Sequence, residues 1–249
     1  MEKAATRFRR LDSERIIETV RALHDRIEER FPGCGLGKVV AELLLAAEEA
    51  VDRTRWIQQP HLPLRAAAGV LSLAIIALVL LLLKHIRNFQ FDDFINSMQG
   101  LDASISSVVF VGAAILFFIG WENRIKRNRA LKAIHELRAL AHIVDMHQLA
   151  KDPESALRGT SMSSTSRRIM TPFELTRYLD YCSDAMALIS KIAALYAQGF
   201  QDPILLDAVD DVEDLTAGFS RKIWQKITIL EGLDNSMAGR EEPPAPESR

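Results

Sequence analysis

Two uncharged apolar runs constrain the fold of this chain more than any other feature of its sequence. They extend from Ala66 to Leu83 and from Ile105 to Trp121, over 18 and 17 residues. At a rise of about 1.5 Å per residue, helices of this length reach about 27 and 26 Å, close to the ~30 Å hydrocarbon core of a bilayer. A buried helix of a soluble protein normally has polar positions every few residues, whereas "LAIIALVLLLL" has none. We therefore expect transmembrane helices at 64–84 and 105–121.

The first apolar run is expected to remain as an anchor. A mostly polar segment of 65 residues precedes it, whereas the apolar core of a cleaved signal peptide lies near the N-terminus. Lys and Arg are more frequent before the first run and after the second than in the connecting stretch, which carries Lys84 and Arg87 together with three aspartates. By the positive-inside rule, both termini are expected in the cytoplasm and the loop 85–104 outside.

A basic cluster follows the second run directly. From its position, we expect it to bind anionic lipid headgroups, at about 1 kcal/mol for each basic residue. The net charge of the whole chain is −2, so a nucleic-acid partner is not needed to explain the cluster. The residues expected at the headgroups are Arg124, Lys126, Arg127 and Arg129.

The segment 1–63 is expected to form an N-terminal helical hairpin. A helix from Asp12 to Arg30 is predicted by one apolar stripe, formed by Ile16, Val20, Leu23 and Ile27. The turn sequence "FPGCGLG" ends it, and a helical pattern resumes from Lys38 to Trp56. The same turn resembles a phosphate-binding loop only superficially, because Walker A requires Ser or Thr where Val39 stands and glycine where Pro32 stands.

The second apolar run continues into a long polar helix. No glycine or proline occurs between Trp121 and Asp152, so a single helix from about Ser104 to Ala150 is expected. Its part at 122–152 forms a cytoplasmic stalk, and a polar, serine-rich linker follows at 153–170.

The segment 171–232 is expected to form a C-terminal, coiled-coil-like helical hairpin. Thr171, Pro172 and Glu174 give the start of its first helix as a capping box. Apolar residues then alternate spacings of four and three, which indicates a heptad seam. The seam contains Leu175, Leu179, Cys182, Met186, Ile189, Ala193 and Tyr196. The facing helix contains Leu205, Ala208, Val212, Leu215, Phe219, Ile223, Ile227 and Leu230. The tail 233–249 has too little apolar content to fold, and the whole chain is expected to be an all-α membrane protein.

The stretch "HELRALAHIVDMHQ" on the stalk carries the residues most suggestive of chemistry. His142 and Asp145 have the i, i+3 relation that a metal site on one helix uses, whereas His135 lies about 10 Å away along the axis and His147 points to another face. Histidine titrates near pH 6.5, so His135 and His147 are also candidates for a proton-sensitive cluster. The alternative is a structural helix, in which His142 pairs with Asp145 and the face of Leu131, His135, Met146 and Leu149 packs against a neighbour. The opposite face is also apolar, so the stalk is expected to contact two partners, such as its own hairpins and a second copy. That face contains Ala133, Leu137, Leu140 and Val144.

Neither the cysteines nor the apolar runs predict a further activity. Cys34 and Cys182 are distant in sequence and lie on the side expected to be reducing, so they indicate no disulfide or metal set. The apolar runs contain Ser72, Ser106 and Ser107 but no charged or amide side chain, whereas ion pathways normally use such groups or carbonyl-lined filters.

Three stretches resemble a group of uncharacterised bacterial membrane proteins with two central spans. They are "ERFPGCGL", "RIKRNRALKAIHELRALAHIVDMHQLAKDPE" and "RKIWQKITIL". The resemblance implies a multi-pass protein of the bacterial inner membrane, with no implied activity.

The leading functional hypothesis is a non-enzymatic scaffold without a cofactor, which presents a cytoplasmic helical assembly for homo-oligomer formation or for binding a cytoplasmic protein. The first alternative is a metal- or proton-responsive sensor that uses the cluster of His135, His142 and Asp145. The second alternative is an ion pathway built from several copies.

Overall fold

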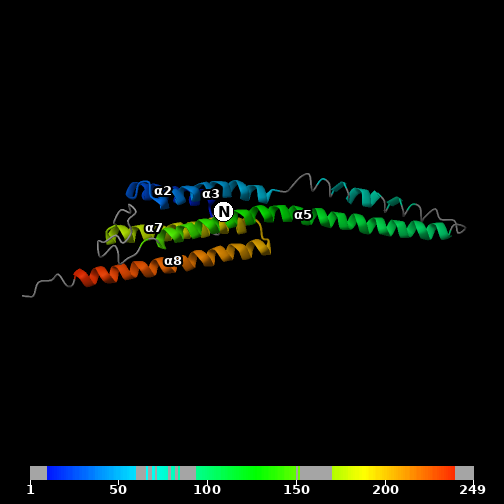
Figure 1. Cartoon of the computed structure of the whole chain (residues 1–249). Coiled ribbons are helices and arrows are strands. Elements are labelled where there is room, and N and C mark those ends of the chain that lie inside the picture. The colour runs from blue at the N-terminus through cyan, green and yellow to red at the C-terminus, as the bar shows by residue number, and fades with distance from the viewer. Residues whose placement is uncertain are drawn as a thin grey trace, which may run out of the picture. The chain divides into compact units, whose positions relative to one another are not determined.

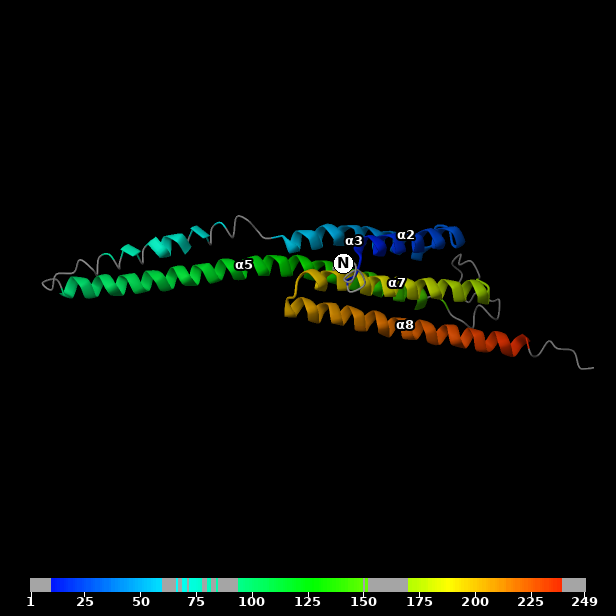
Figure 2. The ribbon, with the colours of Figure 1, turned by 180° about the vertical axis from the view of Figure 1, so that it is seen from behind.

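The fold of the chain is helical throughout the parts that the structure describes. This computed structural model describes residues 10–59, 66, 69–70, 72–77, 80–81, 84, 94–149, 151 and 170–238. Every regular element in these ranges is an α-helix, which confirms the predicted all-α class (Figures 1 and 2). The chain divides into two compact units. Unit 1 contains Met1–Trp56 and Ala130–Arg249, and unit 2 contains Ile57–Arg129.

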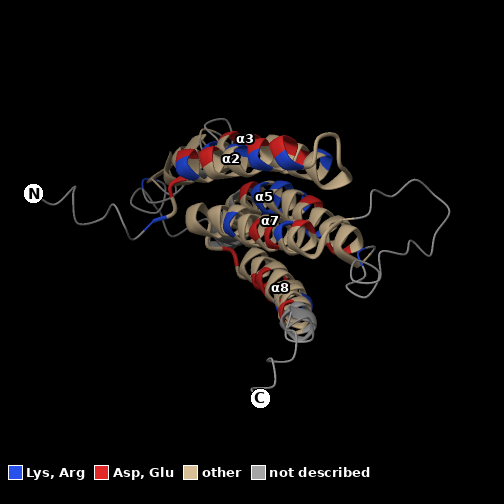
Figure 3. Cartoon of the chain, turned by 90° about the vertical axis from the view of Figure 1, so that its left-hand side faces the viewer, with Lys and Arg blue, Asp and Glu red and all other residues tan. Residues whose placement is uncertain are grey.

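The N-terminal hairpin of unit 1 consists of α2 (Ser13–Arg30) and α3 (Gly35–Gln58), the last two residues of which belong to unit 2. Asp12 caps α2 by accepting hydrogen bonds from the backbone N–H groups of Glu14 and Arg15, at 3.1 and 3.4 Å. The four residues of the predicted apolar stripe of α2 are its buried residues, so the 3.6-residue period predicted the packed face correctly. Charged residues of both signs occupy the solvent side of α2 and α3 (Figure 3).

The turn between α2 and α3 is shorter than the sequence indicated. Gly33 has a φ of +68°, a conformation that glycine adopts without a steric penalty. α3 then begins at Gly35, three residues before the expected start. The residues at 35–37, which were expected in the loop, therefore belong to α3. Leu36 and Val40 of this helix are buried.

The long helix α5 (Phe94–Leu149) contains 56 residues. It begins ten residues before the expected start, so the end of the expected loop 85–104 is helical; residues 85–93 lie outside the described part of the chain. The stretch after Phe94 contains no proline, and continuing the helix satisfies backbone groups that a loop would leave to other partners. The stalk portion from Ala130 onward belongs to unit 1.

The stalk buries one of the two apolar faces that the sequence suggested. The buried apolar residues of α5 in unit 1 are Ala130, Ala133, Ile134, Leu137, Ala141 and Val144. The other face does not pack among the described residues, because His135, Met146 and Leu149 are exposed and Leu131 is half-buried. The face with small residues packs instead, since alanines let a neighbouring helix approach closely.

Helix α7 (Pro172–Gly199) is the most completely buried helix of unit 1. Its start is the predicted capping box, with Thr171 N–H donating to Glu174 Oε2 at 3.0 Å and Glu174 N–H donating to Thr171 Oγ1 at 3.2 Å. All seven residues of the predicted heptad seam are buried. A second face is buried as well, formed by Tyr178, Tyr181, Ala185, Leu188, Ile192 and Leu195. α7 therefore contacts α2 on one side and α8 on the other.

Helix α8 (Pro203–Ala238) runs antiparallel to α7 and ends six residues beyond the expected hairpin (Figure 1). Its buried residues follow the predicted pattern with small shifts, because Val209 and Thr216 are buried and Ala208 and Leu215 are only half-buried. The linker expected at 153–170 lies outside the described residues apart from Met170, and so do residues 239–249 of the expected tail.

Within the described residues, no helix combines the length and the apolar composition that crossing a bilayer requires. This finding does not support the two predicted transmembrane helices. The first predicted span falls partly outside the described part of the chain, at residues 64, 65, 67, 68, 71, 78, 79, 82 and 83.

Candidate functional site

The three histidines of the predicted cluster lie in three different environments on α5. His135 is exposed. His142 is also exposed, and its ring stands edge-on to the ring of Phe219 in α8, with 5.5 Å between centroids. His147 is half-buried and packs against Gly35 of α3, since a β-carbon at Gly35 would lie 2.3 Å from His147 Cε1. The geometry therefore does not bring the three imidazoles together.

Asp145 is engaged away from His142. Its Oδ1 accepts a hydrogen bond from Gln148 Nε2 at 2.6 Å, in place of the predicted pairing with His142. Among the described residues, no group of three or more His, Cys, Asp or Glu side chains gathers closely enough to hold a metal ion. A metal held by His142 and Asp145 therefore stays a prediction that needs further ligands from outside the described residues.

The electrostatics of His147 favour its neutral form. Partial burial lowers the pKa of His147 below the usual value of 6.5, and the positive charge of Lys151 lowers it further. The imidazole of His147 consequently resists protonation while unit 1 is folded. Because His147 lies where α5 meets α3, a change in its charge would affect the packing of these two helices.

Next to His147, the fold places a polar group inside unit 1. Gln148 is fully buried, and its backbone carbonyl accepts a hydrogen bond from Lys226 Nζ of α8 at 3.0 Å. Its side-chain Oε1 has no hydrogen-bond partner in the described part of the chain. Unsatisfied buried amide oxygens are rare. The bond from Lys226 to the Gln148 carbonyl adds a polar contact to the apolar packing at the end of the stalk.

The two cysteines, distant in sequence, lie in one neighbourhood of unit 1. Burial raises the pKa of the Cys182 thiol, and the nearby Cys34 raises it further. A protonated, buried thiol is a poor nucleophile, so Cys182 is part of the core. Cys34 is half-buried, and its Sγ accepts a hydrogen bond from Gly37 N–H at 3.3 Å within the first turn of α3. Sequence separation hid this proximity, which arises because α2 packs on α7 and Phe31, near Cys34, contacts Tyr178.

The Gly-rich turn carries no phosphate-binding geometry. Gly37 lies against α2, where a β-carbon would stand 2.1 Å from Glu28 Oε1. The other carboxylate oxygen of Glu28 accepts a hydrogen bond from Gly33 N–H at 3.0 Å. A carboxylate therefore occupies the place where a phosphate loop would hold an anion, and the glycines serve close helix packing.

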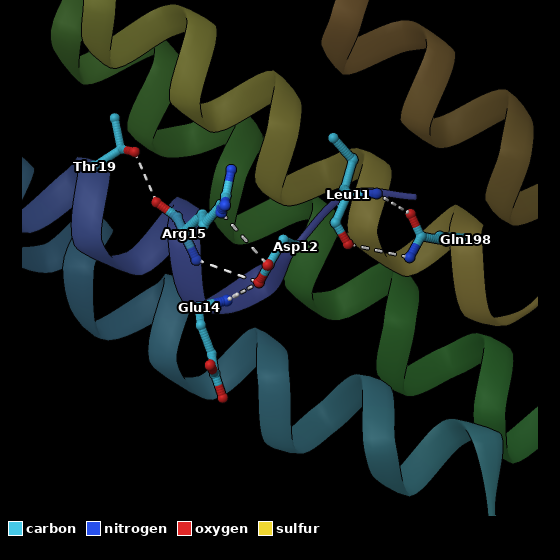
Figure 4. A network of polar contacts seen from close by, with 6 residues as sticks. All are labelled: Leu11, Asp12, Glu14, Arg15, Thr19 and Gln198. Atoms are coloured by element: carbon cyan, nitrogen blue, oxygen red, sulfur yellow. Dashed lines mark hydrogen bonds and ion pairs between the residues drawn. The ribbon is translucent and has the colours of Figure 1, made fainter. Parts of the chain in front are cut away.

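A groove of about 440 Å³ lies between the start of α2 and the middle of α7. The segment before α2 is fixed there by Gln198, whose Oε1 accepts from Leu11 N–H at 2.8 Å and whose Nε2 donates to the Leu11 carbonyl at 3.3 Å (Figure 4). The charged side chains of the groove include the pairs Arg15–Asp12 at 3.7 Å and Arg26–Asp184 at 3.9 Å. These pairs are largely exposed, so water screens them and they provide no built catalytic site.

Unit 2 exposes a large apolar surface in its described residues. Ten large apolar side chains are exposed there, and Phe110 and Leu116 have relative exposures of 75% and 72%. The set consists of Val70, Leu73, Ile76, Leu80, Leu81, Val109, Phe110, Leu116, Phe117 and Trp121. Soluble monomers rarely expose so many large apolar side chains in one part of the chain.

The predicted headgroup residues do not all face solvent. Arg124 and Arg129 are exposed and Arg127 is half-buried. Lys126 is buried, and its Nζ lies 2.9 Å from Glu122 Oε1 in an i, i+4 ion pair. This pairing argues against Lys126 as a headgroup ligand, because its charge is already neutralised within the helix.

Comparison of the chain with protein-family models, with curated proteins and with solved structures finds no match.

Proposed function

We propose that the protein is a membrane-anchored, non-enzymatic scaffold whose helical unit 1 binds other proteins. The observation that carries the proposal is the exposed apolar surface of unit 2. A Leu or Phe side chain in water is less stable by roughly 1.5–3 kcal/mol than the same side chain buried in an apolar environment. A lipid bilayer supplies the missing apolar environment, and the complete sequence of the two uncharged runs has the length that a bilayer requires.

In the proposed topology the segments 64–84 and 105–121 cross the bacterial inner membrane as a hairpin. Two crossings place both termini on one side, and the basic residues after the second run favour the cytoplasm. Arg124, Arg127 and Arg129 would then contact anionic headgroups, with Lys126 held by Glu122. Reporter fusions after residue 90 and after residue 249 test the topology, with the first expected outside and the second in the cytoplasm.

Membrane insertion is tested by fractionation of bacterial cells followed by alkaline carbonate extraction and by flotation with liposomes. The wild-type chain is expected to resist extraction and to float. The double variant Phe110→Arg with Leu116→Arg places two charges on the exposed apolar surface and is expected to lose both properties. Leu45→Arg is the matched control, since Leu45 is an exposed apolar residue of unit 1. A wild-type chain that stays in the aqueous fraction would contradict the proposal.

The proposed protein-binding surface is the exposed stripe of α5 formed by Ile143, Met146 and Leu149. Met146 and Leu149 are 66% and 61% exposed, although they lie beside the packed face of the stalk. We propose that this stripe contacts a second copy, because membrane anchoring would hold two stalks parallel and at high local concentration. Crosslinking and native mass spectrometry in detergent are expected to show an oligomer that Met146→Glu abolishes and the exposed-site control Ile204→Glu retains. A strict monomer in both measurements would disprove this part.

One observation favours a second role as a proton-responsive element. His147 is half-buried between α5 and α3, with a pKa below the usual histidine value. Protonation would place a charge where two helices of unit 1 meet, which couples pH to the packing of the stalk. His135 and His142 are exposed, and His147 is therefore the residue on which this role depends.

A further inference from the structure

Both cysteines of the chain, Cys34 and Cys182, lie in unit 1. Phe31 holds the turn between α2 and α3 against α7, because its ring stands edge-on to Tyr178 at 5.6 Å and to Tyr181 at 6.3 Å. Cys34 N–H donates a hydrogen bond to the Phe31 carbonyl at 3.1 Å. Cys182 follows Tyr181 directly and lies one helical turn beyond Tyr178 on the same face of α7. The fold therefore brings the two thiols into one cluster.

The electrostatics of this cluster agree with the packing. Burial raises the pKa of the Cys182 thiol, and Cys34 raises it further. Burial also raises the pKa of Tyr178, and both cysteines add to this effect. Coulomb interactions weaken with distance, so Cys34, Tyr178 and Cys182 lie close to one another.

Two ammonium groups stand beside the buried thiol. Lys226 Nζ is held at the Gln148 carbonyl, 3.0 Å away, and Lys151 Nζ lies 5.2 Å from the centroid of the Tyr178 ring. The charges of both lysines lower the pKa of Cys182, against the larger effect of burial. They therefore favour the thiolate of Cys182 if a reaction calls for it.

Cys34 is the thiol that a small oxidant reaches first. It is half-buried, and its neighbours Pro32 and Gly33 are exposed. α3 begins at Gly35, so Cys34 stands at the N-cap position, where its Sγ accepts the hydrogen bond from Gly37 N–H at 3.3 Å. The N-terminus of a helix favours negative charge on a capping atom, and reactive cysteines of redox proteins often occupy this position.

We propose that Cys34 and Cys182 form a redox switch, in which hydrogen peroxide oxidises Cys34 and Cys182 converts the product into an intramolecular disulfide. The Cys34 thiolate attacks one peroxide oxygen and the O–O bond breaks, which gives a sulfenic acid. The departing hydroxide takes up the proton that the thiol had released and leaves as water. Cys182 sulfur then attacks Cys34 sulfur, the S–O bond breaks, and the hydroxide leaves as water with the Cys182 proton. Peroxide is thus reduced to water as the two thiols are oxidised.

The disulfide would lock the two hairpins of unit 1 together. It joins the turn between α2 and α3 to α7 and closes a loop of roughly 150 residues, and long loops give a large stabilisation in the chain-entropy model. A dithiol reductant reverses the bond. In a reducing compartment such disulfides are transient and serve redox sensing. The switch depends neither on membrane anchoring nor on oligomer formation.

Peroxide treatment of the reduced full chain in detergent tests the proposal. Free thiols are blocked with N-ethylmaleimide before unfolding, and digestion with mass spectrometry then maps the peptides. We expect the wild-type chain to lose the mass of two hydrogen atoms and to give one linked peptide pair, Cys34 with Cys182. Oxidation should raise the midpoint of thermal unfolding by roughly 5–15 °C. Dithiothreitol should reverse both changes.

Single variants separate the two steps of the reaction. Cys182→Ala is expected to form no disulfide and to accumulate a sulfenic acid at Cys34, which dimedone traps. Cys34→Ser keeps a capping oxygen at this position and is expected to leave Cys182 reduced at the same peroxide concentration. Circular dichroism checks the folding of both variants. If Cys182→Ala unfolds, the peptide map of the wild type and the Cys34→Ser variant still decide.

Several results would overturn the proposal. One is a folded wild-type chain in which both thiols stay reduced, or in which the disulfide forms only after unfolding in urea. Another is equal dimedone labelling of Cys34 in the wild type and in Cys182→Ala, which would show that Cys182 does not react with the sulfenic acid. Disulfide-linked dimers of the wild type through Cys34 would likewise refute an intramolecular switch.

Discussion

His147 packs its imidazole ring directly against Gly35, and a β-carbon on Gly35 would lie only 2.3 Å from His147 Cε1. The two residues belong to α5 and α3 and join the end of the stalk to the N-terminal hairpin of unit 1. Gly35 has no left-handed φ, so the requirement for glycine here comes from close packing and not from backbone conformation.

We predict that Gly35→Ala destabilises the protein by about 1–3 kcal/mol, which is the usual cost of overpacking a well-filled contact. Thermal unfolding followed by circular dichroism measures this effect. The matched control is Gly218→Ala within α8, where the nearest atom to a new β-carbon is Arg221 Nη2 at 3.9 Å. That substitution is expected to stabilise the helix by about 0.5–1 kcal/mol. Adding His147→Ala to Gly35→Ala should recover part of the loss; similar effects of both glycine variants would refute the packing argument.

Acidification is expected to destabilise unit 1 through His147. Its pKa is lowered in the folded chain, so the unfolded chain binds more protons below pH 6.5. The stabilisation is fully present above that pH and decreases as the pH falls toward the folded-state pKa. Urea unfolding at several pH values between about 5 and 7.5 measures the slope. His147→Gln should flatten it, whereas His135→Gln, an exposed change on the same helix, should preserve it. A wild-type slope in the His147→Gln protein would assign the pH dependence to other groups.

Strong alkali is expected to destabilise the bundle through Tyr196. Burial raises the pKa of Tyr196 to about 12, although the charge of Arg53 and its hydrogen bond act in the opposite direction. The unfolded tyrosine ionises near the usual value of about 10, so stability falls as the pH rises above that value. Absorbance of the phenolate at alkaline pH should show a late transition that is missing in Tyr196→Phe. Arg53→Met should move this transition to still higher pH, and an unmoved transition would count against the Arg53 contact.

Replacing Gln198 is expected to release the segment before α2. Gln198→Ala removes both hydrogen bonds to Leu11, each with a net value of about 0.5–1.5 kcal/mol. Hydrogen exchange of the Leu11 amide is the direct measurement and should become much faster. Gln225→Ala, an exposed glutamine on α8, serves as the control. Unchanged protection of Leu11 in Gln198→Ala would show that other contacts hold the segment.

The sequence predicted well those features that depend on local periodicity and capping. The stripe of α2 and the heptad seam of α7 are buried as predicted, and Thr171 starts α7 as a capping box. These features follow from helical geometry and from the hydrogen-bonding needs of a helix end, which involve residues close in sequence. The second buried face of α7 was missed, because its side chains read as an ordinary mixed face until α2 packs on it.

The candidate site was predicted less well. Wheel geometry correctly separated His147 from His135 and His142, but it could not say which of the two apolar faces of the stalk packs within the chain. A stalk with apolar residues on two sides has two nearly equivalent choices, and alanines decided between them by allowing the closer helix approach. Membrane insertion and oligomerisation stay predictions, since both depend on partners outside the chain.

The sequence alone determined that this protein is helical, where α2 and α7 begin, and which residues of these two helices are apolar enough to be buried. Only the tertiary structure decided that Cys34 approaches Cys182 and that His147 meets Gly35. The physical reason is that hydrogen bonding and side-chain periodicity act between residues a few positions apart. Close packing instead selects among many arrangements of the same helices by shape, which no local pattern encodes.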